Sequence, residues 1–293
     1  MMKRLLTVHV FVTAVVAAAI LQGGQTSRAE DKAMTRADIA NKLDDALATA
    51  ESLRDSEQEI ALLKSAAEDV VKAVPENVFV ADEFSQIEKK PANDPKKQAK
   101  QWRNAVKEAR EILRFEPKEE APLPEGFPEL TPVGEIRLQQ YPKYRLAKTE
   151  MTLLEGRAFW TLFNHIKERE IAMTSPVEMT YAADEKGTKK STMSFLYRST
   201  EQGEIGTADK VEVVDVPAQA AISLGIRGSA NRERVADAKR RLENWLQVHN
   251  DEYEASGPLR VMNHNSPFVA ESKQYSEVQI PVRSKNVTTE AKP

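Results

Sequence analysis

Residues 136–148 read IRLQQYPKYRLAK, and apolar side chains recur there at every second position on both sides of a proline. Ile136 and Leu138 alternate with polar residues before the proline, and Tyr144 and Leu146 continue the alternation after it. Side chains with a period of two line one face of a β-strand. The stretch therefore predicts two half-buried strands that are separated at the Tyr141-Pro142 step.

The same plan continues along the chain and then repeats. A helix is expected from about residue 154 to 168, followed by strands near 177–181 and 193–197. A second set is expected as strands at 211–216 and 220–226, a helix at about 230–249, and strands at 259–262 and 277–282. Val216-Pro217 interrupts its strand pair 75 positions after Tyr141-Pro142, which indicates an internal duplication.

The predicted fold class of this part is α+β, with two strand-strand-helix-strand-strand units. Neither unit covers its own sheet face, so we expect the two sheets to pair into an eight-stranded, barrel-like structure with two helices packed against it. A groove between the halves is then the natural place for a ligand.

A different period precedes this module, because residues 30–115 show helical spacing. Apolar residues from Ile39 to Leu53 recur every three or four positions, Ser56 with Glu59 forms a capping box for a second helix, and Asp94-Pro95 opens a third after a loop at 89–97. Three amphipathic helices predict a small bundle without evident chemistry, one that could dock a protein partner.

Residues 116–132 contain five prolines with acidic residues between them, which is typical of a semi-rigid linker. This composition predicts a boundary between the bundle and a domain at 133–283, and residues 284–293 are expected to be a disordered tail. The two modules are expected to fold independently.

The N-terminus has the pattern of a secretory signal peptide. Lys3 and Arg4 precede an apolar run, and Ser27 and Ala29 occupy the −3 and −1 positions of a cleavage site. Cleavage would remove residues 1–29 and leave an exported protein, periplasmic or secreted, without a transmembrane segment. The alternative is an uncleaved anchor, since the run is long enough to span a bilayer.

Composition excludes several classes of function. The chain has no Cys, which removes disulfides, thiolate nucleophiles and iron–sulfur clusters, and its formal charge of −3 argues against nucleic acid as the main partner. Phosphate-binding glycine loops, HExxH, GxSxG and SxxK patterns are missing from the sequence, so the common hydride-transfer, phosphoryl-transfer and hydrolytic mechanisms have no positioned groups.

Several ordered motifs in the second module resemble the SOUL heme-binding family. The signature is the run 171–177, IAMTSPV, and the supporting matches are residues 135–137 and 141–147, 211–217, Gly228, and the run 265–268, NSPF. The resemblance covers about residues 133–283. Two features depart from the family: the connection from the first helix to residue 171 lacks a Gly/Asn-rich insert, and Gly134 stands where an aromatic residue is frequent.

The resemblance implies a duplicated α+β barrel that binds heme or another tetrapyrrole without catalysis and without a fixed axial ligand. It places the ligand on a hydrophobic surface near the first helix and the loop before the last strand. The cofactor-binding candidates are Arg157, Phe159, Phe163, His165, Met173, His264, Phe268 and Lys273. Among these, His165 and His264 are candidate iron ligands, and Arg157 and Lys273 could pair with propionates.

Each candidate also has a structural explanation that requires no ligand. A histidine on a helix is commonly structural, a turn histidine can bind its own backbone, Met173 can simply fill core space, and the two cations can be solvated. A different function also stays open: a ligand-binding or hydrolytic domain of the gyrase-inhibitor-like type, acting on another apolar molecule, with Glu178 activating water. Its own bland alternative is that Glu178 points outward from its strand.

Overall fold

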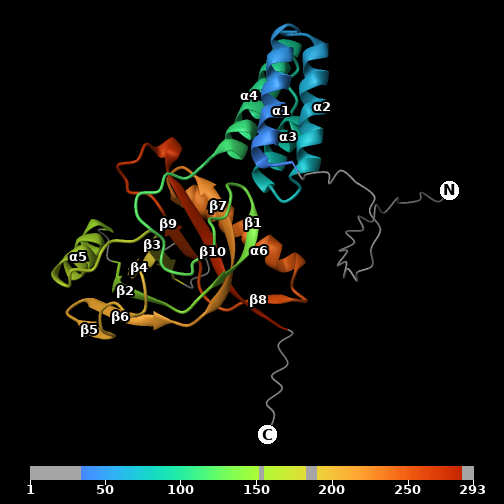
Figure 1. The fold of residues 1–293 in the computed structure, drawn as a ribbon. Coiled ribbons are helices and arrows are strands. Elements are labelled where there is room, and N and C mark those ends of the chain that lie inside the picture. Colours follow the sequence, from blue (N-terminus) through green and yellow to red (C-terminus); the bar gives the residue numbers. More distant parts are fainter. Residues whose placement is uncertain (1–33, 152–154, 183–189, 286–293) are drawn as a thin grey trace, which may run out of the picture. The chain divides into compact units, whose positions relative to one another are not determined.

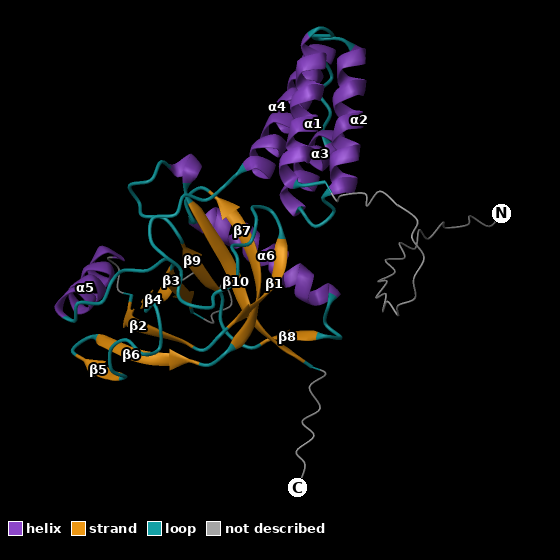
Figure 2. Cartoon of the chain, in the orientation of Figure 1, coloured by secondary structure: helices purple, strands orange, loops and turns teal. Residues whose placement is uncertain are grey.

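The structure is a computed structural model that describes residues 34–151, 155–182 and 190–285 (Figures 1 and 2). The predicted signal peptide at 1–29 and residues 286–293 of the predicted tail lie outside these ranges. Within them, no helix combines the length and the apolar character that crossing a bilayer would require.

The N-terminal module is a bundle of four helices, where the sequence predicted three. Its helices are α1 (Arg36–Glu51), α2 (Glu57–Ala73), α3 (Val78–Lys89) and α4 (Pro95–Arg114). Each begins at a polar residue whose side chain accepts a backbone N–H, as Asn77 does from Val80. The helix that the sequence analysis missed, α3, buries Val80, Phe84 and Ile87 on one stripe, a spacing visible once Pro75 is taken as a helix end.

The second module has the predicted α+β class and the predicted duplication. Its strands are β1 (Ile136–Tyr141), β2 (Tyr144–Glu150), β3 (Val177–Tyr181), β4 (Lys190–Leu196), β5 (Gly206–Ala208), β6 (Val211–Val216), β7 (Gln219–Arg227), β8 (Tyr253–Ala255), β9 (Arg260–Asn263) and β10 (Tyr275–Ser284). Its two long helices are α5 (Glu155–Glu168) and α6 (Arg232–Val248), and η1 (Glu271–Lys273) is a short 3-10 turn. Strands β1 and β6 start 75 positions apart, and so do β2 and β7.

The strands form one antiparallel sheet in the order β1-β7-β10-β9-β3-β4-β2-β6-β5, with β8 beside β10. The first strand of each repeat pairs with the second strand of the other repeat: β1 pairs with β7, and β6 pairs with β2. If the short strands β5 and β8 are left out, the sheet order is therefore symmetric between the two repeats. In the described part of the chain no pairing joins the two ends of the path. The sheet is therefore open and has ten strands, the eight expected ones with the short β5 and β8 in addition, so 'barrel-like' describes it only loosely.

Both helices pack on the same face of this sheet (Figure 1). Leu162 of α5 lies in a core with Ala147 and Phe195, and Leu242 of α6 lies in a core with Leu224 and Val278. The opposite, helix-free face carries polar side chains that are nevertheless buried, among them Glu178, Ser223, Arg260, Glu277 and Gln279. Because these side chains are buried, another part of the chain must lie over this face.

Residues 118–131, which we call the strap, supply that cover. Along its length the strap makes backbone hydrogen bonds to the second module, including Ser175 N to Pro122 O at 3.0 Å and Glu125 N to Arg198 O at 2.9 Å. At its end, Thr131 N donates to the Glu277 carboxylate at 2.9 Å, and Thr131 Oγ1 lies 2.9 Å from Ser223 Oγ. The proline-rich segment is thus packed against the sheet and is not a free spacer.

The bundle contacts the second module next to the strap. Asn77 Nδ2 donates to Val133 O at 2.9 Å, Val78 N donates to Gly134 O at 2.8 Å, and Arg36 pairs with Glu135 at 2.7 Å. Gly134 has φ 81°, and a Cβ placed there would lie 2.3 Å from Asn77 Oδ1. The aromatic residue frequent at this position in SOUL-like sequences is therefore incompatible with the bundle contact. Independent folding of the two modules stays a prediction.

Candidate functional site

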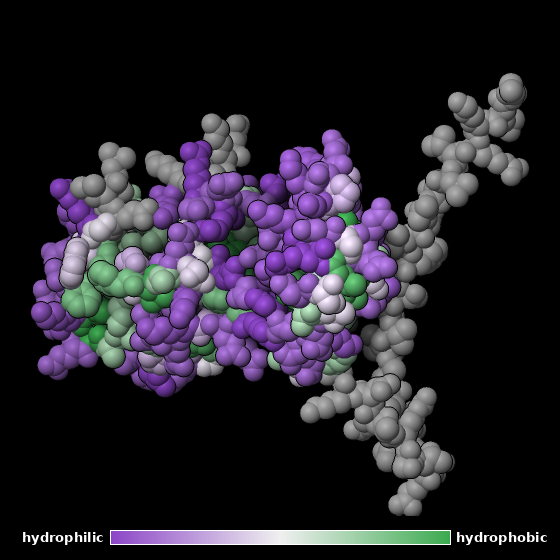
Figure 3. All heavy atoms as spheres, turned by 90° about the horizontal axis from the view of Figure 1, so that it is seen from above, coloured by the Kyte–Doolittle hydropathy of each residue, from purple (hydrophilic) through white to green (hydrophobic). Residues whose placement is uncertain are grey.

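The outer surface of α5 carries a group of aromatic rings. Phe159 and Phe163 lie parallel, with ring centroids 6.1 Å apart, and Phe159 also meets Phe195 of β4 edge-on at 5.2 Å. Trp160 stands edge-on to both helix phenylalanines and is 59% exposed. In Figure 3, apolar surface gathers toward the side of the molecule that carries α5. This is an open apolar surface backed by a packed core, so it can take the flat face of a ligand.

His165 lies on the same helix, at its C-terminal end. It is buried, and its Nε2 lies 3.0 Å from Tyr197 Oη. Burial lowers the pKa of His165 below its ordinary value and the nearby charge of Arg169 lowers it further, so the imidazole is neutral at pH 7. A neutral imidazole is the form that can coordinate a metal.

A cavity of about 420 Å³ opens beside His165. Its wall includes Arg169 and Ile171 after α5, the run 203–208, and Val213 of β6. Arg169 Nη1 donates to His165 O at 3.2 Å, which holds a cation at the cavity rim. Ile205 is 59% exposed, so the apolar surface continues across the rim.

Sequence reasoning missed Trp160, Arg169 and Tyr197 as members of this site. Trp160 had a signal, since it lies between the candidates Phe159 and Phe163 on the same predicted helix. Arg169 and Tyr197 had none, because their role depends on how the end of α5 meets β4.

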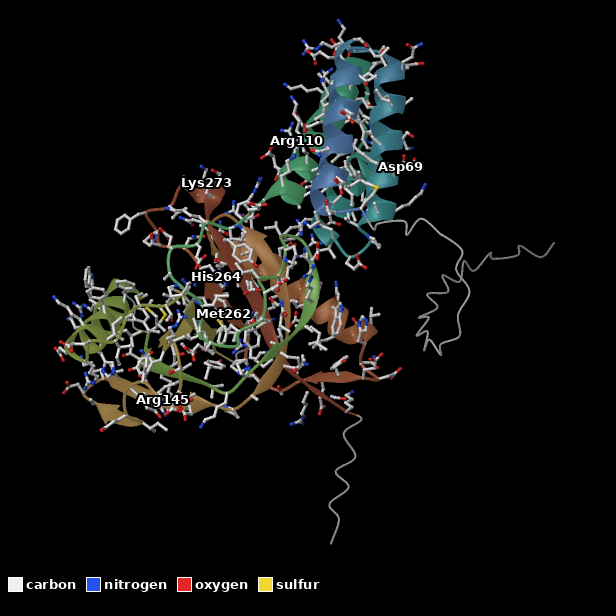
Figure 4. All side chains as sticks on the ribbon, viewed as in Figure 1. Asp69, Arg110, Arg145, Met262, His264 and Lys273 are labelled. Carbon is white, nitrogen blue, oxygen red and sulfur yellow. The ribbon has the colours of Figure 1, made fainter. Side chains whose placement is uncertain are left out.

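The predicted site residues divide between two places. Phe159, Phe163 and His165 lie together on α5, and Met173 is half-buried against the same core. Arg157 is exposed on α5. Figure 4 shows Lys273 and His264 apart from α5, and Phe268, in the loop between them, is 96% exposed. The loop before the last strand therefore does not join the α5 surface in this structure.

His264 belongs to the buried polar face of the sheet. Its Nε2 lies 3.0 Å from Glu277 Oε2 and its Nδ1 lies 3.3 Å from Ser175 Oγ. Burial alone would raise the pKa of Glu277, but hydrogen bonds from His264 and Thr131 and the charge of His264 bring it below its ordinary value. Both ring nitrogens of His264 are engaged, so iron coordination by this residue requires one of these contacts to break. Of the two predicted iron ligands, His165 has the geometry better suited to the role.

Glu178 also lies on this buried face, and it does not point outward from its strand. Its carboxylate is 3.3 Å from Arg260 Nη1 and 3.5 Å from Tyr144 Oη. The carboxylate is thus paired with a buried guanidinium. Among the described residues, no group of three or more His, Asp or Glu is arranged to hold a metal ion.

The sequence of the second module matches the model of a known protein family. The model of the SOUL heme-binding protein family matches residues 130–281, which contain α5, the residues that line the cavity and all of the sheet except the last residues of β10. The chain belongs to the SOUL family. The family match includes the last residues of the strap and leaves the bundle outside.

The solved structures that match this chain are distant from it in sequence and in structure. EcmrR in a DNA complex has 13% identity over 51% of this chain and 57% of that chain, with a TM-score of 0.40. A hydrolase from Listeria innocua has 11% identity over 52% of this chain and 94% of that chain, also with a TM-score of 0.40. SAV2435 bound to tetraphenylphosphonium has 12% identity over 51% and 94%, with a TM-score of 0.33. No curated protein matches the chain.

Proposed function

We propose that this SOUL protein is exported and binds heme or a related tetrapyrrole reversibly, without catalysis, on the aromatic surface of α5. The observation that carries the proposal is the exposed Trp160 ring, which extends an aromatic group beside a cavity lined by a neutral histidine and an arginine. A tetrapyrrole has two apolar faces and an anionic edge. The rings of α5 suit the faces, and Arg169 suits a propionate.

The residues present fit heme in chemistry as well as in shape. Apolar contact supplies the larger part of the affinity, at about 25 cal/mol per Å² buried before the costs of association. His165 is the candidate axial ligand, and Tyr197 would have to release Nε2, or Nδ1 would have to take the role. Arg157 lies two turns earlier on the same helix and is a second candidate for the propionates.

Export rests on the charged and apolar start of the chain and on the Ser27-x-Ala29 pattern. The measurement is the mass of the mature N-terminus after expression in a host with a secretion pathway. A product that begins at residue 30 supports cleavage, a membrane-bound product beginning at Met1 supports an uncleaved anchor, and a cytoplasmic product overturns export.

The heme proposal is tested by titrating hemin into residues 30–293 and following the Soret band. Trp160→Ala should weaken binding several-fold, because it removes the most exposed ring of the surface. Phe268→Ala is the matched control, since Phe268 is even more exposed but lies in the loop before β10. If Phe268→Ala weakens binding and Trp160→Ala does not, the site is the loop and not α5.

The axial role has its own test. His165→Ala should change the Soret and visible bands while leaving apolar binding in place, and His264→Ala should leave the bands unchanged. The absence of any hemin spectral change in the wild type would remove the heme proposal. The alternative hydrolytic function has less support, because the Glu178 carboxylate is held by Arg260. Turnover of a fluorogenic ester that Glu178→Gln abolishes would revive it.

A further inference from the structure

We infer that the helix-free face of the sheet is a second binding site, for a planar aromatic molecule with a carbonyl or carboxylate acceptor, which the strap keeps closed with Phe127 in the ligand's place. This site is separate from the α5 surface and does not depend on heme binding. Three observations carry the inference: the position of Phe127, an unpartnered guanidinium nitrogen on the arginine that contacts both of its tyrosine neighbours, and the way the strap is attached.

Phe127 fills an aromatic cleft. Its ring meets Tyr141 edge-on at 5.1 Å and Tyr144 edge-on at 5.2 Å, and it lies against a core that also contains Leu146 and Leu196. The two tyrosines stand on either side of the Pro142-Lys143 turn, where the chain leaves β1, which pairs with β7, for β2, which pairs with β4 and β6. One ring of the chain's own strap occupies the place between them.

A buried arginine contacts the same two tyrosines. The Arg260 guanidinium carbon is 5.0 Å from the centroid of the Tyr141 ring, and Nη1 donates to Tyr144 Oη at 2.8 Å and to Glu178 at 3.3 Å. Nε donates to Gln279 Oε1 at 3.0 Å. The side chain is only 5% exposed, and its Nη2 is buried without a hydrogen-bond partner in the described part of the chain.

An unpaired buried N–H of a charged group is costly, because it loses water without gaining an acceptor. Burial raises the pKa of Tyr144 to about 12, and burial also raises the pKa of Tyr141, so both hydroxyls keep their protons at neutral pH. The group still lacking at this place is an acceptor, and Glu178 already balances the charge of Arg260. A carbonyl or carboxylate attached to an aromatic ring supplies both the missing acceptor and a replacement for the Phe127 ring.

The strap can release this part without unfolding the sheet. Its ends are attached where Ser266 N donates to Glu120 at 2.7 Å and Thr131 N donates to Glu277 at 2.9 Å. Closer to Phe127, Glu125 N donates to Arg198 O and Gln139 Nε2 donates to Glu129 O, both at 2.9 Å. Between these bonds the chain makes a turn that is closed within the strap by Phe127 N to Pro124 O, with Gly126 at φ 75°. A hinge at this turn lifts the ring while the bonds on either side hold.

The experiment removes the ring and measures binding by calorimetry with two naphthalene probes. Phe127→Ala in the full mature chain should bind 2-naphthoate about tenfold more tightly than the wild type does, and about tenfold more tightly than it binds 2-naphthylmethylammonium, since a hydrogen bond to a charged group is worth about that factor. Phe127→Leu should show a smaller gain of the same sign, and it decides the question if the alanine variant does not fold.

Controls locate the effect. Phe84→Ala removes the same ring from the bundle core, where it stacks on Trp102, and should gain no preference for the carboxylate. Phe127→Ala/Glu178→Gln/Arg260→Gln keeps the space but removes the ion pair, and should lose the preference. Trp160→Ala added to Phe127→Ala should leave naphthoate binding unchanged, which separates this site from the heme surface. If both Phe127 variants bind neither probe, or bind the two probes equally, Phe127 is only a core side chain and the inference is wrong.

Discussion

The two repeats of the SOUL domain share one strand plan and differ in what covers their helices. The outer surface of α5 exposes Trp160 beside two phenylalanines. The outer part of α6 is instead engaged by the bundle, because Arg241 pairs with Asp82 of α3 and lies 5.2 Å from the Phe79 ring. One copy of the duplicated unit is thus left open, and the other is used to hold the N-terminal module.

This difference shows how a duplication permits separate uses of equivalent surfaces. Core positions of the two helices keep the same apolar character, since both must cover the same kind of sheet face. Surface positions are free of that constraint. The helix-free face adds a third environment, polar and closed, in which the strap replaces the helices as the cover.

The strap should have the largest effect on stability. A chain that begins at Val133 leaves Glu277, Ser223 and Gln139 without their partners on the strap, whereas a chain that begins at Glu116 retains them. We expect the shorter chain to be less stable by about 3 kcal/mol or more, because it loses these hydrogen bonds, each worth about 1 kcal/mol, together with the apolar contacts of Phe127. Urea unfolding of the two chains measures the difference. Equal stabilities would mean that the segment is a spacer after all.

Gly134 tests the attachment of the bundle. Gly134→Ala should destabilise the protein by about 1–3 kcal/mol, because a side chain at positive φ is strained and its Cβ would meet Asn77. Gly156→Ala is the matched control: Gly156 is helical with nothing within 4 Å of an added Cβ, so this change should stabilise α5 by about 0.5–1 kcal/mol. Thermal unfolding of both variants provides the comparison, and opposite signs are required.

An ion pair between strands β2 and β6 joins the two repeats and predicts a pH dependence. The Arg145 guanidinium, followed by the Lys143 ammonium, lowers the pKa of Asp215 to about 2. A folded-state pKa below the unfolded value stabilises the protein at higher pH, and this contribution is lost as pH falls from about 4 to about 2. Asp215→Asn should therefore cost about 1 kcal/mol at neutral pH and flatten the acid limb of the stability curve.

The control for this effect is on the same strand. Glu212 pairs with Lys148 at 3.1 Å but is 48% exposed, so Glu212→Gln should change the acid limb little. Stability measured by denaturant at several pH values between 2 and 7 would show the contrast. An acid limb unchanged by Asp215→Asn would show that the pair between repeats carries no stability.

The smallest expected effect on stability concerns the first repeat, whose helix α5 has an exposed outer surface. Trp160→Ala should change the free energy of unfolding by no more than about 0.5 kcal/mol, since an exposed side chain away from caps and cores contributes little. Trp245, its counterpart in aromatic character on α6, stacks on His249 with ring centroids 3.9 Å apart and packs against the α6 core, so Trp245→Ala should cost more. A large loss of stability in Trp160→Ala would mean that the ring serves the fold and not a ligand.

Local patterns in the sequence determined the α+β class, the succession of the main strands along the chain and the duplication. The alternation at 136–148, and its repeat 75 positions later, each depend only on neighbouring residues. The same holds for three of the four bundle helices, for the placing of Phe159, Phe163 and His165 on one helix, and for the SOUL motif itself. Helix α3 was missed although Val80, Phe84 and Ile87 carry its period, because no element was predicted between the second helix and the loop at 89–97.

Only the tertiary structure determined which side chains from distant parts of the sequence contact one another. Glu178 and Arg260 are 82 positions apart, and Thr131 and Glu277 are 146 apart, so no local period relates them. Glu178 meets Arg260 because β3 of one repeat pairs with β9 of the other, and Thr131 meets Glu277 because the strap lies against β10. The strap became a cover, and His264 became a member of a buried network, because polar groups on a buried face must find partners wherever the fold brings them.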